Sequence, residues 1–190
     1  MIGLCIGGSI GFVLGLMNGL FTMSNRVLDS SLQMIRNIPH LALIPLVIRW
    51  FGIGEQGKLF LIILGVFFPI YLNTMHGIRS TDPRLLEMGK VYGLSPWGLL
   101  TRVILPGALP SGLVGLRYAL GVAWLSLVVA EQINASAGIG YLINDARDFL
   151  RTDVIVVGLM VYALLGLGAD ALVRALERRA LAWRPSLIRS

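Results

Sequence analysis

Charged residues are scarce in this 190-residue chain. Asp, Glu, Lys and Arg make up 14% of it, whereas a soluble globular domain carries about 25%. None of the four occurs in residues 1–25, 59–78 or 154–169. A helix that crosses the roughly 30 Å hydrocarbon core of a membrane needs about 20 largely apolar residues, so these gaps predict membrane-spanning helices.

Cysteine, histidine and catalytic patterns are scarce as well. Cys5 is the single cysteine, which excludes an intrachain disulfide framework. The two histidines, His40 and His76, are well separated and lack companion Cys, Asp or Glu residues, so we expect no metal site. No Ser/His/Asp or paired-carboxylate arrangement points to catalysis. We expect a chain that has no catalytic residue and binds no cofactor of its own.

Hydrophobic residues are abundant instead, at 56% of the chain. Uncharged runs at 37–48 and 118–130 become long enough to span a membrane if Arg49 and Arg117 are included. We therefore predict an all-α fold, a polytopic transmembrane bundle in a single domain, 1–190. A soluble α/β enzyme with buried strands is the alternative, but strands average only about 5–6 residues. The expected spans are 2–21, 39–54, 59–78, 111–131 and 154–173.

Basic residues divide unequally when the loops are assigned alternately to two sides of a membrane. The richer side, which includes loop 79–110 and the C-terminus, is cytoplasmic by the positive-inside rule. The net charge of +6 then reflects topology and not a nucleic-acid surface. One side carries Arg26, Arg36, Arg79, Arg84, Lys90, Arg102, Arg174, Arg178, Arg179, Arg184 and Arg189, and the other carries Lys58, Arg147 and Arg151.

Five spans and a cytoplasmic C-terminus place Met1 outside the cytoplasm. Residues 1–25 have neither a basic flank nor an A-x-A cleavage site, as a signal peptide would. We therefore expect this sequence to begin inside a longer protein with at least one earlier span.

Glycine recurs every four residues in the first apolar run, which places a strip of small residues along one helix face. Small residues at this spacing let two helices approach at backbone distance within lipid. We expect a close helical neighbour on this face, which consists of Gly3, Gly7, Gly11, Gly15 and Gly19.

The loop at 79–110 contains two predicted short helices. Asp82 before Pro83, and Ser95 before Pro96, are typical of an N-cap followed by proline at the first helical position. Gly93 should end the first helix. The first helix is amphipathic, so it either rests on the lipid headgroups or docks a cytoplasmic partner.

The same loop carries a spaced signature. It consists of Glu87-Met88-Gly89, three residues, Gly93, nine residues, and then Val103-Ile104-Leu105-Pro106. This spacing resembles the Glu-Ala-Ala signature of permeases of ATP-binding-cassette importers, with Met88 and Gly89 in place of two alanines and Val103 in place of isoleucine. The stretches RNIPHLALIPLVIRWFGIGE and LPGALPSGLVGLRYALGVAWLSLVVAE are similar to the aliphatic-sulfonate, taurine and nitrate permease group, whose members have an additional N-terminal span.

The resemblance implies a non-catalytic transport subunit of the bacterial inner membrane that imports a small anion. Two permease copies would pair, and each would insert this loop into an ATPase subunit that uses ATP and Mg²⁺, while an extracytoplasmic binding protein delivers the substrate. Glu87 would orient or contact the ATPase interface, Gly93 would supply the sharp bend, and Pro106 would end the second helix before the next span. An ion-coupled secondary carrier and a membrane scaffold are the alternatives.

Residues 52–58 read G-I-G-E-Q-G-K and match the start of a phosphate-binding P-loop. The eighth position should be Ser or Thr to hold Mg²⁺, but it is Leu59, and no strand is predicted before the motif. We interpret it as a coincidental turn.

Arg49 and Arg117 fall within predicted spans, where an arginine costs at least about 2.5 kcal/mol and usually faces a cavity or a partner. Arg117 and Trp124 share a helical face and could line a translocation path for an anion. Alternatively, these arginines snorkel to an interface or pair with Glu131, Glu55 or a backbone carbonyl. Both interpretations stay open.

Overall fold

The computed structural model describes residues 2–21, 34–35, 38–52, 54–134 and 138–182. Within these ranges the regular structure is helical and no strand occurs, which confirms the all-α prediction against the α/β alternative. The helices are α1 (Ile2–Leu20), the 3-10 helix η1 (His40–Leu43), α3 (Ile44–Phe51), α4 (Glu55–Arg79), α5 (Pro83–Val91), α6 (Pro96–Leu99), the π-helix η2 (Leu100–Ile104), α7 (Leu105–Asn134), α8 (Ile139–Asp148) and α9 (Thr152–Ala180).

Four helices in the described ranges are long and apolar enough to cross a membrane, and not the five predicted. They are α1, α4, the continuous helix Pro96–Val129 and α9. The predicted span 39–54 forms only a short apolar helix, Leu41–Phe51, whose length of about 16 Å is half a bilayer core. Pro45 lies in the first turn of α3 and Gly52 ends it with φ of +71°, so local chemistry limits this helix at both ends.

The glycine strip of α1 packs directly on α4, as predicted. A Cβ atom on Gly7, Gly11 or Gly15 would lie 2.6 Å from a carbonyl oxygen of α4, on Ile63, Phe67 and Tyr71 respectively. Gly3 and Gly19 meet the side chains of Ile62 and Ile78 in the same way. These contacts advance in the same direction along both helices, so α1 and α4 are parallel.

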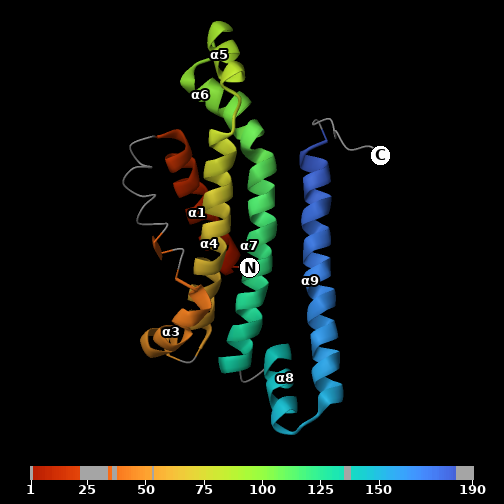
Figure 1. Ribbon diagram of the computed structural model, residues 1–190. Coiled ribbons are helices and arrows are strands. Elements are labelled where there is room, and N and C mark those ends of the chain that lie inside the picture. Colours follow the sequence, from red (N-terminus) through yellow and green to blue (C-terminus); the bar gives the residue numbers. More distant parts are fainter. Residues whose placement is uncertain (1, 22–33, 36–37, 53, 135–137, 183–190) are drawn as a thin grey trace.

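The parallel arrangement has a topological consequence. The C-terminal ends of α1 and α4 lie at the same end of the bundle, near α5 and α6 (Figure 1). The chain between Leu20 and Glu55 must therefore return from one end of the bundle to the other.

Two polar contacts, one buried and one partly buried, join α1 to α4 near this end. The Asn18 amide donates to the Tyr71 hydroxyl at 2.5 Å, and the Arg79 guanidinium donates to the Asn18 carbonyl at 2.9 Å. Asn18 and Tyr71 are both buried, so these bonds satisfy polar groups that lipid could not.

Helix α4 also packs closely on α7, whereas α9 is attached more loosely. Gly77 and Gly115 allow the first contact, because Cβ atoms there would lie 2.9 Å from the Ala108 carbonyl and 3.0 Å from the Pro69 carbonyl. Helix α9 stands at the side of the bundle and packs against α7 and α8 (Figure 1). Much of the apolar surface of α9 is exposed, as expected for contact with lipid or another subunit. The exposed apolar side chains include Val157, Leu159, Met160, Leu164, Leu167 and Leu172.

Candidate functional site

A helical knuckle, residues 80–104, projects beyond the ends of α4 and α7 (Figure 1). Both predicted N-caps are present. The Asp82 carboxylate accepts the Arg84 backbone N–H at 2.9 Å, and the Ser95 hydroxyl accepts that of Gly98 at 3.2 Å. Pro83 and Pro96 follow the caps, so each short helix begins where the local sequence chemistry requires.

The bend between α5 and α6 is centred on Gly93, which has φ of +75°. Its N–H donates to the Lys90 carbonyl at 2.9 Å, and the Leu94 N–H donates to the Gly89 carbonyl at 3.0 Å. This pair of bonds is a Schellman motif, in which glycine takes the left-handed conformation after the helix. The predicted bend at Gly93 is confirmed.

Gly89 holds the two short helices together. It is buried, and a Cβ atom on it would lie 2.6 Å from Leu99 Cδ2 and 3.3 Å from Leu94 Cδ1. Met88, in contrast, is exposed and takes no part in the contact between the two short helices. Met88 and Gly89 stand where the signature has two alanines. The packing requires a small residue only at position 89, and glycine is the smallest.

The prediction that Pro106 ends the second helix is wrong. Helix α6 continues through η2 into α7, and Pro96–Val129 is one uninterrupted helix. The Leu105 N–H donates to the Leu100 carbonyl, five residues earlier. In a regular α-helix, the ring of Pro106 would clash with the carbonyl four residues before it, and the wider π-turn relieves that clash. The knuckle is therefore continuous with a membrane-crossing helix.

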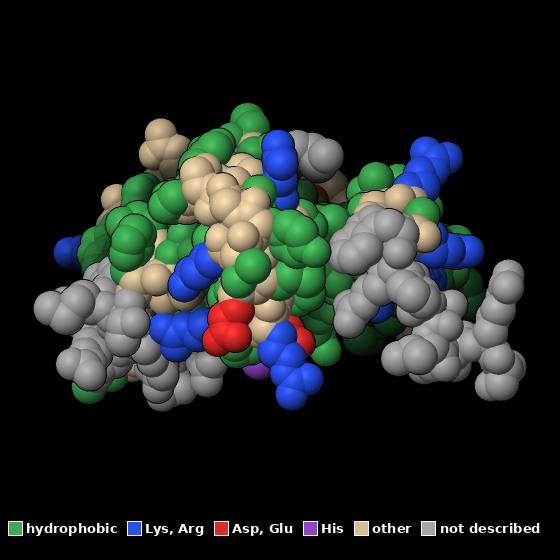
Figure 2. All heavy atoms as spheres, turned by 90° about the horizontal axis from the view of Figure 1, so that it is seen from above, with side chains coloured by type: hydrophobic (Ala, Val, Ile, Leu, Met, Phe, Trp, Pro, Cys, Tyr) green, Lys and Arg blue, Asp and Glu red, His purple; other side chains and the backbone are tan. Residues whose placement is uncertain are grey.

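The tip of the knuckle exposes large apolar side chains. Val91 is 86% exposed, Tyr92 80% and Trp97 71%, and Leu85 and Met88 are about half exposed. Seen from this end, Lys and Arg side chains lie among the hydrophobic ones (Figure 2). The exposed charged residues of the knuckle are Asp82, Arg84, Glu87, Lys90 and Arg102. An exposed apolar group with a polar rim is typical of a protein interaction surface.

The predicted site residues fall into separate groups. Glu87, Met88, Gly89 and Gly93 belong to the knuckle, and Leu105 and Pro106 lie at its base, whereas the glycine strip serves helix packing. The other two predicted residues, Arg117 and Trp124, lie farther along α7 and face α9, where they line a cavity of about 140 Å³.

Arg117 is ion-paired, but not with the predicted partners. Its guanidinium donates to the Glu177 carboxylate, and its Nε lies 3.5 Å from Asp170 Oδ1. The expected partner Glu131 instead accepts bonds from Gly140 N–H and the Tyr162 hydroxyl, and Glu55 pairs with Lys58. Charged residues at a spacing of four and three residues lie on one face of α9, namely Asp170, Arg174 and Glu177. This pattern could have identified Glu177 from the sequence.

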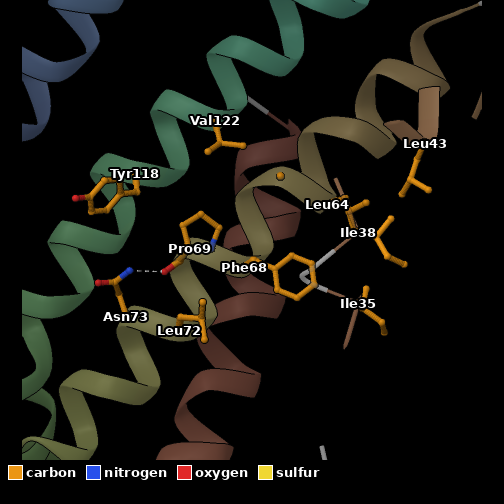
Figure 3. A pocket seen from close by; sticks show the side chains of 11 residues that line it. Ile35, Ile38, Leu43, Leu64, Phe68, Pro69, Leu72, Asn73, Tyr118 and Val122 are labelled. Carbon is orange, nitrogen blue, oxygen red and sulfur yellow. Dashed lines mark hydrogen bonds between the residues drawn. The ribbon is translucent and has the colours of Figure 1, made fainter. Parts of the chain in front are cut away.

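A larger apolar cavity, of about 380 Å³, was not anticipated from the sequence. It lies against α4 and α7 and is lined by Leu64, Phe68, Pro69, Tyr118 and Val122 among others (Figure 3). At its edge the Asn73 amide donates to the Pro69 carbonyl at 2.8 Å. This bond satisfies the Asn73 amide N–H locally, and the lining is mainly hydrophobic.

The P-loop-like stretch begins at Gly52, the C-cap of α3, and ends in the first turn of α4, while residue 53 lies outside the described residues. Gly54 precedes the first residue of α4, and in the described part of the chain a helix, and not a strand, comes before it. It lies at the end of the bundle opposite the knuckle (Figure 1).

Arg49 is exposed in the last turn of α3. Among the residues with defined positions, no group of three His, Cys, Asp or Glu side chains could hold a metal ion.

Residues 7–181 match a protein family described as the inner membrane component of binding-protein-dependent transport systems. The chain belongs to this family. As such an inner membrane component it crosses the membrane several times, in agreement with its apolar helices.

Curated relatives of this inner membrane component are named as transport permeases. It is 59% identical over 186 residues to the putative aliphatic sulfonates transport permease protein SsuC of Escherichia coli, covering 98% of this chain and 71% of the relative. The protein of the same name from Bacillus subtilis is 45% identical, with 97% and 67% covered. The taurine transport system permease protein TauC of E. coli is 39% identical, with 91% and 63% covered.

Proposed function

We propose that this chain is the permease subunit of an ATP-driven importer and that its knuckle docks an ATPase subunit. The observation that carries the proposal is the knuckle itself. Both of its helices have N-caps, Gly89 allows them to pack closely, and Gly93 forms the bend between them. Its tip exposes apolar side chains. A surface helix resting on lipid headgroups would not need to stand out beyond the bundle (Figure 1).

The basic residues support a cytoplasmic position for the knuckle and the C-terminus. Helix α9 runs so that its C-terminal end lies toward the same end of the bundle as the knuckle (Figure 1). Positive charge is concentrated on the cytoplasmic side of membrane proteins. The described basic residues at this end are Arg79, Arg84, Lys90, Arg102, Arg174, Arg178 and Arg179.

The continuous helix from Pro96 to Val129 supplies a mechanical route. Hydrolysis of ATP with Mg²⁺ takes place in the ATPase, and this chain contributes no catalytic residue. Closure of two ATPase subunits moves the knuckles of two paired permease copies. Because no break separates the knuckle from α7, the displacement reaches the membrane without passing through a flexible loop.

The substrate we propose is a small anion delivered by an extracytoplasmic binding protein. The names of the relatives favour an aliphatic sulfonate or taurine, and nitrate follows from the sequence resemblance. A role of Arg117 and Trp124 in the translocation path stays a prediction. Pairing of Arg117 with two carboxylates weakens it, because the positive charge is already balanced.

Reconstituted transport tests this function. Liposomes that contain the permease with its ATPase should accumulate an alkanesulfonate or taurine only when ATP is inside and the binding protein outside. Uptake driven by a proton gradient without ATP would instead show an ion-coupled carrier. No uptake under any condition, despite intact complexes, would favour a scaffold.

A further inference from the structure

Helices α7 and α9 are joined at two points with a space between them. On the knuckle side, Arg117 of α7 contacts Asp170 and Glu177 of α9. Farther away, the rings of Trp124 and Tyr162 meet edge to face with centroids 5.8 Å apart. The cavity of about 140 Å³ lies between these points.

This interface is not tightly packed. A Cβ atom on Gly121 would find no atom within 4 Å, and one on Gly166 would only reach the Trp124 ring at 3.7 Å. At the contact of α1 with α4, in contrast, a Cβ atom on Gly7, Gly11 or Gly15 would lie 2.6 Å from a backbone oxygen. Between Gly121 and Gly166 the two helices are thus loosely packed, and the ion pairs lie on the knuckle side of this gap.

The charges at this contact balance one another. Arg174 lies 2.9 Å from the second carboxylate oxygen of Asp170, so two arginines face two acids. Side chains of Arg117, Asp170 and Glu177 are 39%, 35% and 28% exposed. Half-buried charges in a membrane protein are costly when unpaired. The group therefore favours α9 staying attached to α7 and has no net charge with which to hold an anion.

We infer that Arg117 is a positioning residue that transmits knuckle movement from α7 to α9. This rests on the proposed function. Arg117 lies on the uninterrupted helix Pro96–Val129, which also contains α6 of the knuckle, so displacement of α6 moves the guanidinium. Through Asp170 and Glu177 that movement pulls α9, whose other contact with α7 can act as a pivot.

The test compares Arg117→Gln, Glu177→Gln and the charge-reversed pair Arg117→Glu/Glu177→Arg in reconstituted complexes. Its readout is substrate transported per ATP hydrolysed. Each single change should lower this ratio about fivefold, the size of a typical coupling between contacting side chains. ATPase binding and ATP hydrolysis should persist, because the knuckle is intact. The reversed pair should recover at least half of the ratio.

Arg178→Gln is the matched control, since it removes an exposed arginine one residue beyond Glu177 on the same helix. It should leave the ratio unchanged. A normal ratio in Arg117→Gln would overturn the inference. So would a reversed pair no better than the single variants, particularly with a raised KM for the substrate, because Arg117 would then contact the anion itself.

The inference can still be tested if a single variant fails to fold. If neither single variant is recovered from membranes, the reversed pair decides alone: normal coupling supports the inference and uncoupled hydrolysis contradicts it. Absence of ATP-dependent uptake by the unaltered complex is a different outcome, because it refutes the proposed function on which the inference rests.

Discussion

At the scale of single residues, glycines on the same helix have different roles. On α1, a Cβ atom at Gly11 would lie 2.6 Å from a backbone oxygen of α4, whereas at Gly8 it would meet only the end of the Ile70 side chain at 3.2 Å. A backbone atom cannot move aside as a side-chain terminus can. The two positions therefore form a matched pair for measuring how closely α1 and α4 must approach.

Gly11→Ala should destabilise the protein and Gly8→Ala should not. Overpacking costs about 1–3 kcal/mol, whereas alanine improves helix propensity by about 1 kcal/mol where space permits. Thermal unfolding in detergent measures this, and Gly11→Ala should have a clearly lower Tm than Gly8→Ala. Equal Tm values would show that α1 is not in backbone contact with α4.

Residue chemistry was readable from the sequence where partners are local. The caps at Asp82 and Ser95 and the bend at Gly93 involve atoms within five residues, so short motifs predict them. The pairing of Arg117 with Glu177 spans 60 residues. It depends on how α7 and α9 are placed in space, which no local pattern specifies.

At the scale of elements, helix existence was predicted better than helix limits. The predicted spans 2–21 and 59–78 correspond to α1 and α4. Pro106 was expected to end a helix, yet η2 accommodates it, because a π-turn removes the steric conflict that proline creates in an α-helix. Segment 39–54 was expected to span the membrane, but Pro45 and Gly52 confine its α-helix, Ile44–Phe51, to eight residues.

Pro106→Ala should impair coupling without harming stability. Removing the ring lets η2 relax toward a regular α-helix, which rotates the knuckle relative to α7. Uptake should fall several-fold, by an amount equivalent to about 1 kcal/mol, while the Tm stays the same or rises.

Pro110→Ala is the control for this change, because Pro110 is also inside α7 but lies beyond the π-turn. It should affect uptake less. If the two variants transport equally well, the π-turn does not set the orientation of the knuckle.

At the scale of the whole molecule, the bundle has two unlike ends. One carries the knuckle and most described basic residues, and the other carries α3, α8 and the turn before α9 (Figure 1). The parallel packing of α1 and α4 is a tertiary feature that hydropathy could not show. It fits the predicted odd number of crossings, although in the described part of the chain four helices are long enough to span.

Labelling of engineered cysteines should separate these ends. In a Cys5→Ser background, Phe149→Cys should react with a membrane-impermeant maleimide on intact cells, and Val91→Cys only after permeabilisation. Both side chains are highly exposed in the structure, so unequal reactivity reports topology and not burial. The reverse pattern would place the knuckle outside the cytoplasm and exclude ATPase docking.

The most direct test of the account is photo-cross-linking from the tip of the knuckle. A benzophenone side chain at Tyr92 in the assembled transporter should form a covalent adduct with the ATPase, whereas the same group at Phe149 should form none. A preparation that takes up substrate with ATP, yet shows no ATPase adduct from Tyr92 or its exposed neighbour Trp97, would contradict the docking role of the knuckle.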